Sequence, residues 1–107
     1  MITVINRATM QTRLPALGVY VGRPGVLGNP YVVTTESKRG EMIAKYEVWL
    51  RDRMRTTNPV SNEIDRLVQH VLKGGTLSLE CSCHPKQCHA NVIKAVIEEE
   101  LENTNAV

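Results

Sequence analysis

All three cysteines of the chain lie within one short stretch, together with two of its three histidines. Residues 80–89 read ECSCHPKQCH. Thiols and imidazoles in such density are typical of two chemistries: a sulfur nucleophile that a histidine base activates, and a zinc ion held by soft ligands. This stretch is the strongest chemical signal in the sequence.

The nucleophile interpretation favours Cys88, because a helix is predicted to begin there. A thiol in the first turn of a helix is close to the positive end of the helix dipole and to unpaired backbone N–H groups, which lower its pKa. His89, or alternatively His84, is then the base. We predict Cys88 and His89 as the catalytic pair, with Cys83 in the same pocket.

Zinc is the alternative for the same residues. The five potential ligands exceed the four that tetrahedral zinc needs; they are Cys81, Cys83, His84, Cys88 and His89. Their spacing argues against it, because structural zinc commonly uses two separated pairs of ligands, and here all five form one cluster. We therefore predict no cofactor, with zinc as the alternative. For Cys81 alone, burial as a small apolar residue is favoured.

A second segment, residues 19–30, reads VYVGRPGVLGNP and predicts a strand that runs into a glycine-rich loop. Glycines let the backbone approach a phosphate closely, and an arginine can bind an oxyanion with two hydrogen bonds. The predicted ligand-binding residues are Gly22, Arg23, Gly25, Gly28 and Asn29, together with Cys83. The alternative is a pair of tight turns, with Arg23 in an internal salt bridge and Asn29 fixing a turn. The segment matches neither of the common nucleotide-binding glycine motifs.

Hydrophobic periodicity predicts the elements that position these two segments. We expect strands at 2–5, 18–21 and 76–83, a brief edge strand at 31–33, and helices that begin near Ser37, Ser61 and Cys88. Residues 103–107 are expected to fray. This order predicts one α/β domain over residues 1–107, a small sandwich with a short mixed or parallel sheet and about three packed helices. In such folds, ligands bind where strands end and loops lead into helices.

Composition limits the classes of function. The formal net charge is +2, but residues 1–55 carry nine basic and four acidic side chains, whereas residues 56–107 carry four and seven. A basic half that contains a glycine-rich loop favours an anionic ligand. The absence of a basic run and of phenylalanine argues against nucleic acid as the partner. No stretch predicts a membrane span or a secretion signal, so we expect a cytoplasmic protein.

The two segments together resemble a family of small phage and bacterial proteins of unknown function. The resemblance covers residues 2–101 and rests on VYVGRP at 19–24, GNP at 28–30, Tyr46, Trp49-Leu50, Cys81-x-Cys83 and Cys88-His89. Members often carry a bulky residue between the two strand cysteines, where this chain has Ser82. The resemblance implies that the residues of one shared pattern line one pocket. These residues are Arg23, Gly28, Asn29, Cys83, Cys88 and His89.

These observations predict that the chain binds a small anionic ligand such as a nucleotide, a modified base or a phosphorylated metabolite. They leave open whether the chain also processes this ligand and is an enzyme. The pocket is expected between the loop at 22–30 and the turn at 81–89. The alternative is a protein-interaction module of the phage accessory type, either stabilised by zinc or with its cysteines in the core. The sequence alone identifies neither a reaction nor a protein partner.

Overall fold

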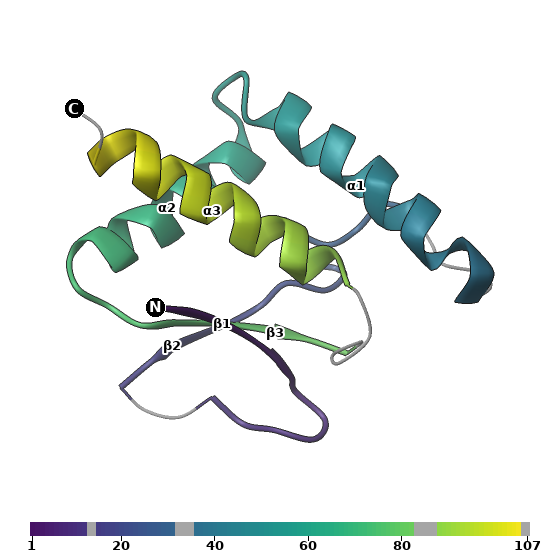
Figure 1. Ribbon diagram of the computed structural model, residues 1–107, viewed down its shortest axis with the longest axis horizontal. Coiled ribbons are helices and arrows are strands. Elements are labelled where there is room, and N and C mark those ends of the chain that lie inside the picture. The colour runs from purple at the N-terminus through teal and green to yellow at the C-terminus, as the bar shows by residue number, and fades with distance from the viewer. Residues whose placement is uncertain (13–14, 32–35, 83–87, 106–107) are drawn as a thin grey trace.

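The computed structural model describes residues 1–12, 15–31, 36–82 and 88–105. Three helices lie together on one side of a three-stranded sheet (Figure 1). In chain order the elements are β1 (Ile2–Asn6), β2 (Leu17–Tyr20), the short 3-10 helix η1 (Glu36–Lys38), α1 (Arg39–Arg53), α2 (Pro59–Leu72), β3 (Leu77–Cys81) and α3 (His89–Asn105). The protein is therefore a small α/β domain with a parallel sheet.

The sheet has the order β1-β3-β2, and both outer strands run parallel to β3. Val4 and Val19 both align with Leu79, so these three side chains share the face that meets the helices. Leu77, Leu79 and Cys81 are buried on that face. The strict alternation of β3 thus places its apolar side chains in the core, as the sequence predicts.

Two of the helices pack directly on this face, and the third packs on those two. The helix α3 packs on β1 and β3, and α2 packs on β3, while α1 packs on α2 and α3. Apolar residues at helical spacing supply the contacts, because they form one stripe on each helix. The most deeply buried of them are Tyr46, Leu50, Ile64, Leu67, Ile93 and Ile97. The predicted helical stripes are therefore the ones that form the core.

Among the residues that the structure describes, no helix lies on the opposite face of the sheet. The described parts of the connection between β1 and β2, residues 7–12 and 15–16, lie on the side of this face (Figure 1). The Thr12 hydroxyl donates a hydrogen bond to the Glu80 carboxylate and ties the connection to the central strand. Parallel sheets bury both of their faces, and here a single loop has to cover one of them.

The helix starts differ from the predicted ones. The predicted cap Ser61 is the third residue inside α2, and the N-cap is Asn58, whose side-chain oxygen accepts from the N–H groups of Val60 and Ser61. The sequence pattern was misread at Asn58, because the proline that follows does not break this helix. Pro59 occupies the first helical position, to which proline is well suited. Likewise α1 follows η1, and its N-cap is Lys38, not Ser37.

Other boundaries shift by a few residues. The helix α2 ends at Leu72, and Gly74 follows with φ +92°, the left-handed conformation that favours glycine just after a helix. The strand β3 ends at Cys81, and α3 includes Asn103 to Asn105, which we expected in a frayed tail. The expected strand at 31–33 lies mostly outside the described residues. Among the helices that the structure describes, none is both long and apolar enough to cross a membrane.

Candidate functional site

The candidate site lies at the carboxyl ends of the parallel strands. The segment that follows β2 passes beside the start of α3, the helix that follows β3 (Figure 1). In open α/β sheets this edge is where ligands bind. The two segments that the sequence analysis singled out are therefore neighbours in space, although about 60 residues separate them along the chain.

The contact between the segments is a hydrogen bond from His89 to Val21. The Nε2 atom of His89 lies 2.6 Å from the carbonyl oxygen of Val21. Because a carbonyl oxygen only accepts, Nε2 carries the proton and donates it. In the neutral ring the other nitrogen, Nδ1, then has a free lone pair. The loop after β2 thereby selects the tautomer of a histidine on α3.

Cys88 lies next to that lone pair. Its Sγ is 3.5 Å from Nδ1 of His89, within reach of a weak hydrogen bond from the thiol. The backbone N–H of Cys88 donates to the Oδ1 of Asn91 at 3.1 Å, which fixes the first turn of α3. The side chain is buried, with the residue 1% exposed. This arrangement permits a proton to move from sulfur to imidazole, so Cys88 and His89 have the geometry of a nucleophile and its base.

Tyr46 supports this pair from α1. The hydroxyl group donates a hydrogen bond to the carbonyl oxygen of Leu27 at 2.8 Å, and the ring packs edge-on against the His89 imidazole, with the centroids 5.0 Å apart. Burial raises the pKa of Tyr46, and the nearby Cys88 raises it further. Tyr46 is therefore a neutral phenol that holds the loop, α1 and α3 together.

The environment of His89 favours the neutral imidazole. Burial has the largest effect and lowers the pKa of His89; the hydrogen bond to Val21 opposes this, and the charge of Arg23 lowers the pKa further. Burial and the charge of Arg23 both disfavour the protonated, positively charged form of the ring. Arg23 is therefore close enough to His89 for its charge to act on the ring.

The loop itself consists of two consecutive tight turns. Gly25 N–H donates to the carbonyl of Gly22 at 3.0 Å, across a cis bond between Arg23 and Pro24, and Gly28 N–H donates to the carbonyl of Gly25 at 2.9 Å. A Cβ atom on Gly28 would lie 2.9–3.0 Å from Arg23, including its backbone N and Cα. Gly28 is thus needed because the loop folds onto itself.

Asn29 has a local role as well. The residue is 9% exposed, and its Oδ1 accepts the backbone N–H of Tyr31 at 2.8 Å, which forms a turn with Pro30 at its centre. The tight-turn interpretation of the loop is therefore right for its backbone. The same interpretation also predicted an internal salt bridge of Arg23, which is absent among the described residues.

Two arginines at this edge have no described carboxylate as partner. Arg23 is exposed, and Arg7, which follows β1, has its guanidinium 4.2 Å from the centre of the Tyr20 ring. The backbone N–H of Arg7 donates to the carbonyl of Cys81 at 2.9 Å, so the backbone of Arg7 also lies at the carboxyl edge of the sheet. By contrast, four other arginines pair with acidic side chains; they are Arg39, Arg51, Arg55 and Arg66. Among the described residues, the edge therefore carries two positive charges without a carboxylate partner.

The predicted metal ligands are only partly described. Cys81 is 1% exposed and belongs to the core cluster beside Leu79, as the burial alternative expected. Cys83 and His84 lie outside the described residues. Within the described ranges, no group of three or more cysteine, histidine or acidic side chains is arranged to hold a metal ion.

Sequence reasoning missed three contributors to the site. Val21 acts through its carbonyl oxygen, which no residue-type pattern reveals. Tyr46 belongs to the pattern that carries the family resemblance, but it stands on an apolar helical stripe and was not assigned to the site. Arg7 belongs to a segment without a motif, and only the pairing of β1 with β3 brings it to this edge.

The comparisons with known proteins identify a family. The sequence profile of the family described as "Domain of unknown function (DUF4326)" matches residues 4–99. The chain belongs to this family. No curated protein and no solved structure matches the chain. Membership in DUF4326 supports the resemblance seen in the sequence and brings no reaction with it.

Proposed function

We propose that this DUF4326 protein binds a small anionic ligand, such as a nucleotide, a modified base or a phosphorylated metabolite, at the carboxyl edge of its sheet. Arg23 holds the anionic group, the turns at 22–30 shape the approach, and Cys88 and His89 face the other end of the ligand. The observation that carries the proposal is the hydrogen bond between His89 and the Val21 carbonyl, which joins the loop that contains Arg23 to the helix that contains Cys88 and His89. Among the described residues Arg23 has no carboxylate partner, and its charge acts on the His89 ring.

The charge balance of the edge supports an anion. Arg23 and Arg7 lack described carboxylate partners, and the N-terminus of the 17-residue helix α3 adds the positive end of its dipole. An anion bound there gains charge-assisted hydrogen bonds without displacing an existing ion pair. A cation would meet only repulsion from these groups.

Thermal shift with inorganic phosphate, AMP and ribose 5-phosphate tests the proposal. A ligand that binds only the folded protein raises the melting temperature by mass action. We expect Arg23→Ala to weaken the binding of the stabilising ligand at least tenfold, because it removes a charge-assisted contact. Arg55→Ala is the matched control: this exposed arginine lies just after the end of α1, and the variant should bind as the unmodified chain does.

A second readout locates the bound anion. Because the Arg23 charge lowers the pKa of His89, an anion bound to Arg23 should raise that pKa, which NMR of the His89 ring measures. If none of the three compounds stabilises the protein and the His89 pKa does not respond to phosphate, the anion site is wrong.

Alkylation tests the role assigned to Cys88. After trypsin, Cys88 is the only cysteine in the peptide 87–94, whereas Cys81 and Cys83 share the peptide 74–86. We expect iodoacetamide to modify Cys88 faster at neutral pH than it modifies a free thiol, and His89→Gln to remove the difference. Equal rates in the unmodified chain would contradict a nucleophilic role.

A zinc-stabilised interaction module is the second candidate, and one distance favours it. Two ligands of a tetrahedral zinc, one sulfur and one imidazole nitrogen, are about 3.6 Å apart, given their usual bond lengths. Cys88 Sγ and His89 Nδ1 are separated by 3.5 Å. The bond from Nε2 to a carbonyl is also the usual outer support of a zinc-bound histidine. Native mass spectrometry before and after a chelator decides: a stoichiometric zinc mass supports this candidate.

A further inference from the structure

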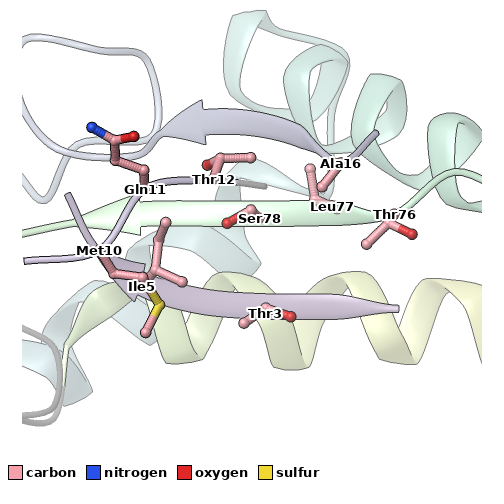
Figure 2. A pocket seen from close by; sticks show the side chains of 9 residues that line it. All are labelled: Thr3, Ile5, Met10, Gln11, Thr12, Ala16, Thr76, Leu77 and Ser78. Carbon is pink, nitrogen blue, oxygen red and sulfur yellow. The ribbon is translucent and has the colours of Figure 1, made fainter. Parts of the chain in front are cut away.

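The face of the sheet opposite the helices contains a cavity of about 210 Å³, separate from the site at the carboxyl edge. It lies between β1 and β2, over β3, beside Met10, Gln11, Thr12 and Ala16 of the connection between β1 and β2 (Figure 2). One loop cannot cover three strands as completely as a helix layer does, so space remains on a face that parallel sheets normally bury. The cavity is thus a consequence of the topology.

The floor and one wall of this cavity are apolar. Ile5 is 4% exposed and lies next to Met10, whose side chain is 54% exposed at the rim (Figure 2). Ala16 lines the opposite end, next to Leu77. A thioether at the edge of an aromatic ring makes a favourable contact, so Met10 suits a flat ring below it.

The middle of the cavity carries hydroxyl groups from three segments. Ser78 lies at the centre of the floor, with Thr3 on β1 and Thr12 on the connection at either side (Figure 2). The Thr12 hydroxyl donates to Glu80, so it offers only acceptor positions to a ligand, whereas the hydroxyls of Thr3 and Ser78 can turn to donate. The Gln11 amide adds one donor and one acceptor group. Both kinds of partner are therefore available.

No ionisable side chain is found among the described residues that line the cavity, and the Glu80 carboxylate touches this lining through the Thr12 hydroxyl, whose hydrogen bond it accepts. An anion would lose its hydration near this carboxylate, and a cation would have to compete with Thr12 for it, so burying either charge is costly. A pure hydrocarbon would leave the hydroxyl groups without partners. At about 210 Å³ the space is smaller than the usual cavity for a drug-sized ligand, and it suits a single ring system.

We propose that this cavity binds an uncharged heterocycle of the size of a nucleobase, with its ring between Ile5 and Met10 and its polar edge on Ser78 and Thr3. This site is independent of the anion site. It takes a neutral, flat molecule that carries both donors and acceptors, and it needs neither Arg23 nor His89.

Amide NMR of the full chain with adenine, cytosine and uracil tests the proposal. We expect at least one base to shift the amide signals of Thr3, Thr12 and Ser78, and toluene and benzoate to bind at least tenfold more weakly. Arg23→Ala should leave this binding unchanged, which separates the result from that of the anion site. Shifts confined to residues 21–29 and 88–91, or equal binding of toluene, would overturn the proposal, as would the absence of shifts with all three bases.

Two variants test the position of the ligand. Ala16→Trp fills the cavity and should reduce the affinity for the base at least tenfold. If that variant does not fold, Met10→Ala decides, because Met10 is largely exposed and its loss spares the core. Met10→Ala should weaken binding several-fold. An unchanged affinity in Ala16→Trp, or in Met10→Ala where Ala16→Trp does not fold, would contradict the proposed ring position.

Discussion

The imidazole of His89 donates to the carbonyl oxygen of Val21 across 2.6 Å, and this one bond joins the segment that follows β2 to the first residue of α3, the helix that follows β3. Its effect is both structural and chemical. It anchors the loop after β2 to α3, and it turns Nδ1 toward the Cys88 sulfur. A substitution in the loop after β2 should therefore alter the surroundings of His89, and a substitution of His89 should alter the loop.

The stability of the protein should fall as the pH is lowered through about 6.5, the ordinary pKa of histidine. The pKa of His89 is lowered in the folded state, mainly by burial, so below this pH the unfolded chain binds a proton that the folded chain does not. The free energy of unfolding then decreases with falling pH until the folded pKa is reached. Urea unfolding between pH 8 and pH 5 measures the effect. His89→Gln should flatten this part of the curve, and an equally steep curve in the variant would assign the effect to other groups.

Tyr46→Phe should lower the free energy of unfolding by about 1–3 kcal/mol, because it leaves the buried Leu27 carbonyl without its donor. The ring contact with His89 is kept, so the loss reports the hydroxyl alone. Tyr31→Phe is the control: this tyrosine is 37% exposed, and its change should stay within about 0.5 kcal/mol. Equal effects of the two changes in urea unfolding would rule out a special role for Tyr46.

Gly28→Ala should destabilise the protein by about 1–3 kcal/mol, because the new methyl group would press on the Arg23 backbone. The same change at Gly40 gives the opposite expectation. Gly40 lies in α1 with no atom within 4 Å of an added Cβ, so alanine should stabilise the helix by up to about 1 kcal/mol. Thermal unfolding of the two variants compares them directly. A neutral Gly28→Ala would mean that the loop can open without cost.

Asn58→Ala should cost about 0.5–2 kcal/mol, since it removes the side-chain cap of α2. Asn62→Ala provides the comparison within the same helix. Asn62 is exposed one turn later, where alanine is the better helix former, so the change should be neutral or slightly stabilising. Chemical denaturation of both variants is sufficient. If Asn58→Ala proves as harmless as Asn62→Ala, the capping hydrogen bonds contribute nothing.

Periodicity in the sequence was enough to predict the α/β class and the buried faces. The alternation along β3 and the stripe of α2 each require one side of the element to be apolar, so the burial of Leu79 and Leu67 follows from local pattern. Helix starts were harder, because Ser61 and Asn58 both have side chains that cap, and only the position of Pro59 separates them.

The candidate site was predictable only in part, for a physical reason. Cys88, His89 and Arg23 have side chains with distinctive chemistry, so residue type alone marked them. The bond that unites them uses the backbone of Val21, and every residue offers the same carbonyl. Strand order was needed to see which carbonyl meets the imidazole, and no local pattern encodes that β3 lies between β1 and β2.

The central position of β3 has a consequence for how the chain is made. Neither β1 nor β2 has a neighbour until residues 77–81 arrive, and those residues belong to the last third of the chain. During translation, the first two strands therefore leave the ribosome well before β3 can pair with them, and this sheet forms only after residues 77–81 have been made.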